Sequence, residues 1–230
     1  MKKSIVGIIV FVVVLAGALY MFSNNKKLSS ETNSLTEQNV AGDMNQTSDT
    51  DNSNSKVLNV VSAESKATYE INELLRGTKT HVTGNSNTLS GSVILNASTH
   101  TIEKAEIKLA ANSFKTDIAA RDGNVSKLIF KADQASNEFI TYTVSSVEGW
   151  PATVEMDKDY SVKVNGDLKI SDVAKPVIFN GDAHIDEDGS FHIKAKTVLT
   201  YGDFGLTIPD FPFLANVDKT TDLSIELIAR

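Results

Sequence analysis

The feature that most constrains this chain is a two-residue alternation of apolar and polar side chains from Tyr160 to Ile170. Successive side chains of a β-strand point to opposite faces, so the pattern predicts a strand with one buried and one solvated face. The alternation recurs at Val177–Ile185, Phe191–Tyr201 and Leu223–Ala229. Weaker runs follow the same period at residues 68–75, 79–84, 88–96, 102–112 and 138–147. We therefore expect eight or nine strands in a sandwich or an antiparallel barrel.

One segment, Thr116–Phe130, lacks the period of two and is expected to hold a short helix capped by Thr116 or Asp117. At most one or two short helices are expected in all. The fold class predicted from the pattern is therefore all-β.

The segment Asp186-Glu187-Asp188-Gly189 separates two strands and is typical of a hairpin turn. A two-residue turn at Asp188-Gly189 would pair His184 with Ile193 and His192 with Ile185. The two histidines would then lie diagonally on one outer face, where they could bind a metal weakly. No third ligand is evident, so ordinary exposed histidines are the preferred interpretation, and no metal site is predicted.

Composition divides the chain into three parts. Residues 1–22 contain an uncharged run from Ile5 to Phe22 after Lys2 and Lys3, which predicts a transmembrane signal anchor with the rest of the chain outside the cytoplasm. Ala16-Gly17-Ala18 leaves a cleaved signal peptide as the alternative, in which case the protein is secreted. Residues 23–56 are polar and predict a disordered linker, and residues 57–230 form the folded domain.

Charge and cysteine content exclude several functions. Residues 1–56 hold five basic and five acidic residues, so the net charge of −7 belongs to residues 57–230. An acidic domain repels phosphate backbones, and nucleic acid is not an expected partner. The chain has no cysteine, which excludes disulfides and a thiolate nucleophile. None of the common catalytic or cofactor-binding motifs is present, so no enzyme activity and no cofactor are predicted.

Small residues occupy the middle of consecutive predicted strands, at Gly166, Gly181, Ala183 and Ala195. They would leave the centre of a barrel underfilled and able to hold a small ligand, or they would relieve strain where strands bend. The alternation alone does not decide between the two. The expected lumen wall consists of Val162, Val164, Leu168, Phe179, Ala183, Phe191, Ile193, Ala195, Tyr201 and Phe204.

Three local motifs resemble the YceI-like family of exported, lipocalin-like proteins. They are the segment from Gly166 through Lys175-Pro176-Val177 to Phe179, the segment from Ser113 through Thr116 to Arg121-Asp122, and Asp203-Phe204-Gly205-Leu206. The resemblance covers about Tyr69 to Arg230. It implies an extended antiparallel barrel of about eight strands with a helix beside it, and binding of polyisoprenoids or other long-chain amphiphiles in the lumen. The family commonly has an Arg before its Asp-Phe-Gly, where this chain has Thr200-Tyr201-Gly202, so a contact through that Arg does not carry over.

Polar contacts for a lipid head group are expected at Arg121 and Asp122, with a surface turn or a helix-stabilising pair as the alternative role. Asp203 is expected to fix its own turn through local hydrogen bonds. The apolar loop from Ile208 to Leu214 is expected to close one barrel end, or else to lie at a membrane surface.

The sequence thus predicts a membrane-anchored, extracytoplasmic (periplasmic or cell-surface) bacterial envelope protein that stores or carries an isoprenoid or another long-chain lipid. The alternatives are a structural or stress-related envelope module whose barrel is filled by its own side chains and, with least support, a hydrolase or isomerase. The oligomeric state is open, with a homodimer as one arrangement.

Overall fold

The computed structural model describes residues 54–210, 212 and 214–230. The predicted anchor at residues 1–22 and most of the predicted linker at residues 23–56 lie outside these residues. Strand β1 begins at Ser55, two residues before the predicted domain boundary. In the part that the structure describes, no helix has the length and apolar character needed to cross a membrane.

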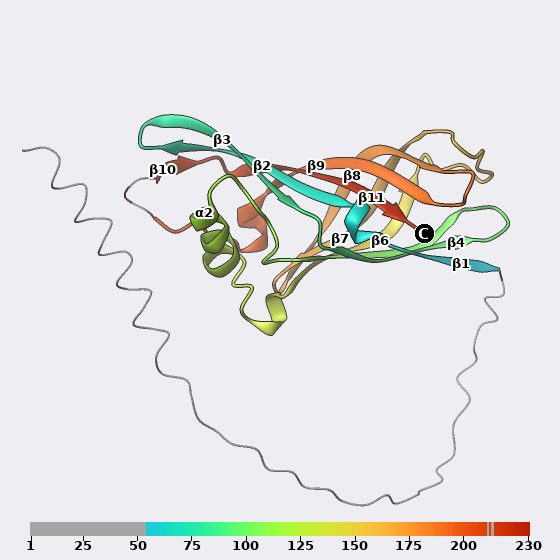
Figure 1. Cartoon of the computed structure of the whole chain (residues 1–230), viewed down its shortest axis with the longest axis horizontal. Helices are drawn as coiled ribbons and strands as arrows, with labels where there is room; N and C mark the ends of the chain where they lie inside the picture. Colours follow the sequence, from blue (N-terminus) through green and yellow to red (C-terminus); the bar gives the residue numbers. More distant parts are fainter. Residues whose placement is uncertain (1–53, 211, 213) are drawn as a thin grey trace, which may run out of the picture. The chain divides into compact units, whose positions relative to one another are not determined.

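Eleven antiparallel strands form one curled sheet in the order β1-β4-β5-β6-β7-β8-β9-β11-β2-β10, with β3 paired to β2. The sheet curls into a half-barrel (Figure 1). The strands are β1 Ser55–Asn59, β2 Lys66–Leu75, β3 Thr78–Ser86, β4 Leu89–Asn96, β5 Ile102–Ala110, β6 Phe139–Glu148, β7 Tyr160–Ile170, β8 Val173–Ile185, β9 Phe191–Thr200, β10 Leu214–Val217 and β11 Thr220–Ala229. Every strand predicted from the alternation is present. The short strands β1 and β10 were not predicted.

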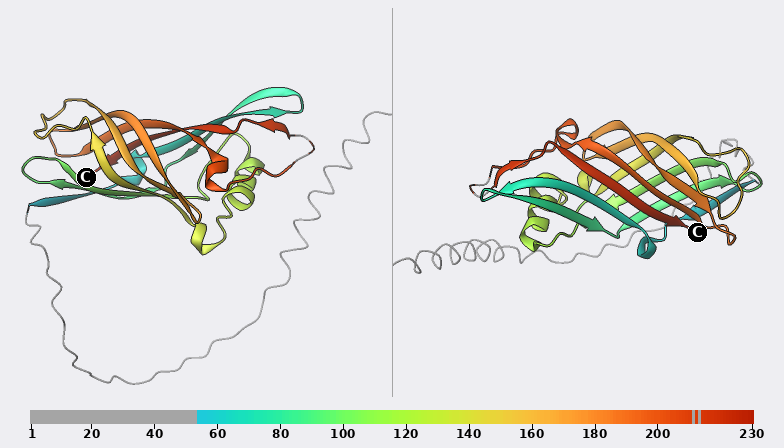
Figure 2. Two further views of the ribbon diagram at one scale, coloured as in Figure 1. Left: turned by 180° about the vertical axis from the view of Figure 1, so that it is seen from behind. Right: turned by 90° about the horizontal axis from the view of Figure 1, so that it is seen from above.

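The sheet approaches closure where β1 meets the end of β11. Val60 forms an isolated bridge with Ala229, and the backbones of Asn59 and Arg230 exchange two hydrogen bonds of 2.6 and 2.9 Å. At the opposite end, the hairpin β2–β3, β10 and the helix α2 (Ala119–Asn124) lie beside one another (Figures 1 and 2). The half-barrel therefore has two differently built ends.

The predicted helix is shorter than the segment proposed for it and is capped differently. Its N-cap is Ile118, which makes no side-chain capping bond, so the prediction of Thr116 or Asp117 as the cap is wrong. Thr116 instead donates its backbone N–H and its hydroxyl to Asp122 Oδ1, at 2.8 and 2.7 Å. A π-helical turn, η2 (Val125–Ile129), continues α2. Single 3-10 turns lie at η1 (Ser62–Glu64), η3 (Ala135–Asn137) and η4 (Tyr201–Phe204).

The β8–β9 hairpin differs by one residue from the predicted register. His184 lies directly opposite His192, and Ile185 lies opposite Phe191. Five residues lie between the end of β8 and the start of β9. Within this loop, Asp186 N donates to Ser190 O at 2.9 Å and Gly189 N donates to Asp186 O at 2.8 Å. Gly189 has a φ of +81°, which glycine adopts at little cost. The prediction of a two-residue turn at Asp188-Gly189 is therefore wrong, and the two histidines lie directly opposite each other instead of diagonally.

Candidate functional site

The interior of the half-barrel contains an unfilled space of about 600 Å³, called here the main cavity. The same inner wall also lines a second space of about 90 Å³, the small cavity. Single strands contribute to both. On β7, Leu168 and Ile170 line the main cavity, whereas Val162 and Val164 line the small one. The two spaces therefore follow one another along the strands.

Tyr142 and Phe179 stand between the two spaces and line both of them. Their rings meet edge to face with centroids 5.1 Å apart. The Tyr142 hydroxyl lies 2.8 Å from Val164 O and 2.9 Å from Val177 O, to which it can donate a hydrogen bond. Burial raises the pKa of the Tyr142 hydroxyl, and so does the charge of Asp167 to a smaller extent. This pair of rings separates the main cavity from the small cavity.

Glycines 166 and 181 do not create the main cavity. A Cβ on Gly166 would lie 2.7 Å from the Tyr142 ring, and one on Gly181 would lie 1.9 Å from Lys194 O. The space beside Gly166 is thus filled by an aromatic ring, and Gly181 allows close approach of β8 and β9. Ala183 and Ala195 line only the small cavity. The predicted unfilled space is therefore present, but the main cavity lies toward the other end of the strands from most of the small residues that suggested it.

The main cavity is formed mainly where β2, α2, η2 and η4 come together. Tyr69, Phe114 and Phe130 form one aromatic row in its wall, with centroid distances of 5.1 and 6.1 Å. The Tyr69 ring lies against Gly84, where an added Cβ would be 2.1 Å from Tyr69 Cε1. These rings therefore lie along one wall, and the lumen between them and the opposite wall is left unfilled.

A single ion pair provides the clearest polar contact of this wall. Arg121 Nη2 lies 2.8 Å from Glu73 Oε1, and the two side chains are only 15% and 11% exposed. Arg121 also bonds to the exposed carboxylate of Asp117. Burial by itself lowers the pKa of Arg121, but the hydrogen bonds and charges of Glu73 and Asp117 outweigh it and raise that pKa above its ordinary value. Arg121 therefore remains a cation beside an apolar space.

Tyr69 lies beside this ion pair. Burial raises the pKa of the Tyr69 hydroxyl to about 12; the charge of Arg121 opposes the rise, and the carboxylates of Asp122, Glu73 and Asp117 add to it. Arg76 and Asn124 also line the cavity. This side of the cavity thus offers donors and acceptors to a ligand that is otherwise apolar.

The predicted site residues divide between the two spaces. Leu168, Phe179, Tyr201, Phe204 and Arg121 line the main cavity. Val162, Val164, Ala183, Phe191, Ile193 and Ala195 line the small cavity, as does Phe179. Asp122 lines neither, because its carboxylate holds Thr116 in front of α2.

Two further expectations concern the segment after β9. The turn at Asp203 is held by backbone, with Gly205 N donating to Gly202 O at 3.0 Å and Gly205 at a φ of +71°. Among the described residues, the Asp203 side chain makes no hydrogen bond, so its proposed role in the turn is wrong. From the apolar loop, Ile208 and Leu214 line the main cavity. Phe211 and Phe213 lie outside the described residues.

The sequence interpretation missed Glu73, although a signal for it exists. On β2, Ala67, Tyr69, Ile71 and Leu75 share the apolar phase of the alternation, and all line the main cavity. Glu73 is the one charged residue in that phase. A lone carboxylate on a buried face needs a cationic partner, which indicates a buried ion pair or a ligand contact.

Comparison with known proteins gives a consistent result. A sequence model described as the YceI-like domain matches residues 58–229. A solved polyisoprenoid-binding domain from Saccharophagus degradans, implicated in plant cell wall breakdown, superimposes with a TM-score of 0.58 at 14% identity, covering 75% of this chain and 97% of that one. BcnA from Burkholderia cenocepacia has a TM-score of 0.53 at 17% identity, covering 74% and 99%. These likenesses show a shared fold. No curated protein matches the sequence closely enough to count as a relative.

Proposed function

The protein belongs to the YceI-like family, and from this premise we propose that it binds an isoprenoid or another long-chain amphiphilic lipid in the main cavity. We further propose that it does so outside the cytoplasm, attached to the membrane through residues 1–22, as a carrier or store of that lipid. The observation that carries the proposal is the unfilled space of about 600 Å³. Its volume is within the range typical of small-molecule sites.

The wall of the cavity favours an apolar chain. Its lining residues are predominantly aliphatic and aromatic, so binding would come mainly from apolar surface removed from water. The ion pair of Arg121 and Glu73 gives a polar contact for a hydroxyl, carbonyl or similar head group. A structural module with a self-filled barrel would lack such a space, so the cavity argues against this alternative.

The same wall argues against hydrolysis or isomerisation. Among the described residues of the lining, Glu73 is the only carboxylate, and it is engaged by Arg121. General acid–base catalysis on an apolar substrate would need a second group free to exchange a proton. We therefore propose binding rather than catalysis.

The decisive test is lipid binding by the full chain. The protein is purified in mild detergent, and native mass spectrometry is used to detect co-purified lipid. A defined polyprenol is then added while thermal unfolding is followed. A ligand that binds only the folded state raises the midpoint in a concentration-dependent way. A lipid-free protein that gains no thermal stability from any long-chain alcohol or fatty acid would refute the proposal.

A matched pair of variants tests whether the lipid binds in the main cavity. Val125 lines the main cavity, whereas Leu128, on the same helical turn, is 44% exposed and does not line it. Val125→Glu puts a carboxylate into the apolar wall and should weaken polyprenol binding at least tenfold. Leu128→Glu introduces the same group next to solvent and should leave binding unchanged. Equal effects of the two variants would place the lipid elsewhere.

A further inference from the structure

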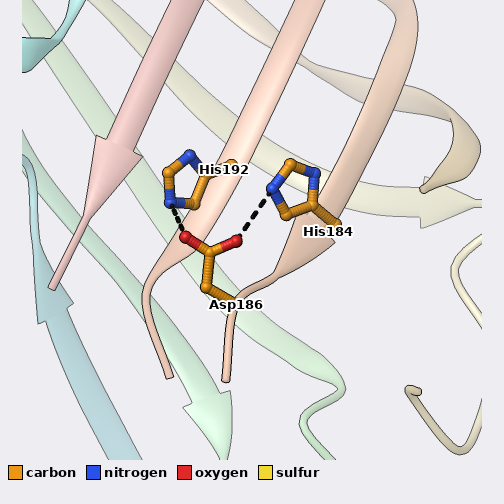
Figure 3. A group of neighbouring side chains, drawn as sticks. All are labelled: His184, Asp186 and His192. Atoms are coloured by element: carbon orange, nitrogen blue, oxygen red, sulfur yellow. Dashed lines mark ion pairs between the residues drawn. The ribbon is translucent and has the colours of Figure 1, made fainter. Parts of the chain in front are cut away.

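Two histidines and one aspartate form a compact cluster at the β8–β9 hairpin (Figure 3). His184 and His192 lie opposite each other, with rings stacked at a centroid distance of 4.8 Å and an interplanar angle of 10°. Asp186, in the connecting loop, places Oδ1 3.1 Å from His184 Nε2 and Oδ2 2.8 Å from His192 Nε2. One ligand atom from each residue thus lies within 4.8 Å of the other two.

The cluster lies on the outer face of the half-barrel. Ile185 and Phe191, which alternate with the histidines, are almost fully buried in the core. The His184 and His192 side chains remain 30% and 22% exposed. Neither of them lines the main cavity or the small cavity. A function of this cluster is therefore separate from the binding of lipid.

A fourth residue orients one of the two rings. His184 Nδ1 lies 2.8 Å from Asp159 Oδ1 in a hydrogen bond. When Nδ1 donates to a carboxylate, the lone pair of a neutral ring is on Nε2, the atom that faces Asp186. Metal-binding histidines are commonly held in this way, with the second ring nitrogen donating to a carboxylate.

The contact between His192 and Asp186 is close but is not a hydrogen bond. His192 Nε2 is shielded from solvent and has no hydrogen-bond partner, although Asp186 Oδ2 is only 2.8 Å away. The oxygen therefore lies off the axis along which this nitrogen would donate a proton. The Nε2 atom of His192 is therefore available as a metal ligand when it carries the lone pair of the ring.

We propose that His184 Nε2, His192 Nε2 and the Asp186 carboxylate bind a divalent late first-row transition metal, such as Zn²⁺, with water as the fourth ligand. Two imidazoles and a carboxylate suit Zn²⁺ or Cu²⁺, whereas Ca²⁺ and Mg²⁺ prefer oxygen ligands alone. In a tetrahedral zinc site with bonds of about 2.0–2.1 Å, neighbouring ligand atoms are about 3.3 Å apart. From the nitrogen–oxygen distances of 2.8 and 3.1 Å, metal binding requires a small outward movement of the carboxylate. It also requires the two stacked rings, whose ligand atoms lie within 4.8 Å of each other, to turn toward the metal.

The surrounding charges favour a dication at this place. Asp159 contacts His184 directly, and Asp188 lies in the same loop. Two cations also contact this loop: Lys56 Nζ lies 3.4 Å from Gly189 O, and Arg230 Nε lies 3.2 Å from Ser190 Oγ. The guanidinium of Arg230 is engaged by both carboxylate oxygens of Glu64, at 2.6 and 2.8 Å.

Zinc titration of the full chain tests the site. The protein is prepared without an affinity tag and free of metal, and Zn²⁺ is added in competition with a chromophoric chelator. All four histidines of the chain lie in its described part, so residues 1–53 contribute none. We expect one Zn²⁺ per chain and a higher unfolding midpoint in its presence.

Single substitutions separate a metal site from a simple ion pair. His192→Asn and Asp186→Asn should each weaken Zn²⁺ binding more than tenfold while the circular dichroism spectrum stays unchanged. Asp159→Asn should weaken it about tenfold through the orientation of His184. The matched control is His81→Asn, because His81 is a surface histidine 3.5 Å from a single carboxylate of Glu70. That variant should bind Zn²⁺ as the parent protein does.

Two outcomes would overturn the proposal. One is the absence of stoichiometric Zn²⁺ binding. His192→Asn, Asp186→Asn and Asp159→Asn would then change stability by the same amount with and without Zn²⁺, as expected for a simple cluster of ion pairs. The other is an equal loss of binding in His81→Asn, as expected for non-specific association. Lipid binding is measured separately on the same variants, so failure of the metal site and failure of the lipid site are distinguishable.

Discussion

Strands β4 to β9 and β11 contribute to both ends of the half-barrel, whereas β2, β3 and β10 contribute to one of them, and the two ends are filled differently. The packed end comprises the residues around the small cavity together with Trp150 and Tyr160; the cavity end comprises the residues around the main cavity. At the packed end, Trp150 meets the rings of Tyr160 and Phe191 edge to face, with centroids 5.5 and 5.8 Å apart. The indole Nε1 also donates to His100 O at 3.1 Å. Only about 90 Å³ remains unfilled there.

The cavity end has more aromatic rings than the packed end but arranges them along its wall. Tyr69 meets Phe114 edge to face and lies against the strand at Gly84, Phe114 stacks on Phe130, and about 600 Å³ remains between these rings and the opposite wall. The number of apolar side chains therefore does not decide whether a half-barrel holds a ligand. The direction in which the rings pack decides it.

Truncating one ring at each end should give the largest difference. Trp150→Ala removes two edge-to-face contacts and a hydrogen bond, and we expect a loss of about 3–4 kcal/mol in unfolding free energy. Phe130→Ala should lose only about 1–2 kcal/mol, because part of that ring already faces unfilled space and makes fewer contacts. Denaturant unfolding followed by far-ultraviolet circular dichroism measures both losses. Equal losses would mean that the cavity end is packed as tightly as the other.

Enlarging an alanine at each end makes the opposite change and tests the same difference in packing. Ala195 lines the small cavity, and its Cα would lie 2.5 Å from a Cβ added to Gly181. Ala195→Phe should therefore overpack the core and cost about 2–3 kcal/mol.

The matched change at the cavity end is Ala67→Phe, on a residue that lines the main cavity. The added ring can occupy the void, so we expect a loss below about 1 kcal/mol and at least tenfold weaker polyprenol binding. A destabilisation as large as that of Ala195→Phe would show that the space does not exist in solution.

Much of this fold could be predicted because alternation is a local property. The run from Tyr160 to Ile170 matches β7 residue for residue, and the family resemblance gave the correct class of sheet. The hairpin register could not be obtained in the same way. A five-residue loop held by Asp186 and Ser190 shifts the pairing by one residue, and the segment Asp186–Gly189 is compatible with either loop length.

The position of the main cavity also could not be predicted from a local sequence pattern. Gly166 suggested an underfilled centre, but Tyr142, on the neighbouring strand, covers it. Void volume depends on how every side chain of the wall packs and on which segments cover the ends. α2, η2 and η4 supply that cover here, and no alternation predicts their placement. The place of Asp186 beside the two histidines was not predicted for a related reason, since Asp186 belongs to the loop of misassigned register.

The last prediction concerns the pH dependence of stability and tests whether the Tyr69 hydroxyl at the cavity end is shielded from solvent. Burial raises the pKa of Tyr69 to about 12, above the ordinary value of 10.0. The folded state therefore holds this proton more tightly than the unfolded state does. The resulting stabilisation is complete below about pH 10 and is lost as the pH rises from 10 towards 12. We expect a loss of about 1–2 kcal/mol, less than the full shift implies, because the ring is partly accessible to solvent.

Tyr69→Phe isolates this contribution. The burial that raises the pKa of Tyr142 causes a loss in the same direction, so the variant should lose less stability than the parent between pH 10 and 12 while still losing some. Identical pH profiles would show that the Tyr69 hydroxyl is hydrated and that the cavity end is wet. A polyprenol bound in the main cavity would exclude water from Tyr69 still further. The loss in the parent protein should then begin at higher pH when lipid is present, and Tyr69→Phe should show a smaller shift, because Tyr142 remains in the wall to respond.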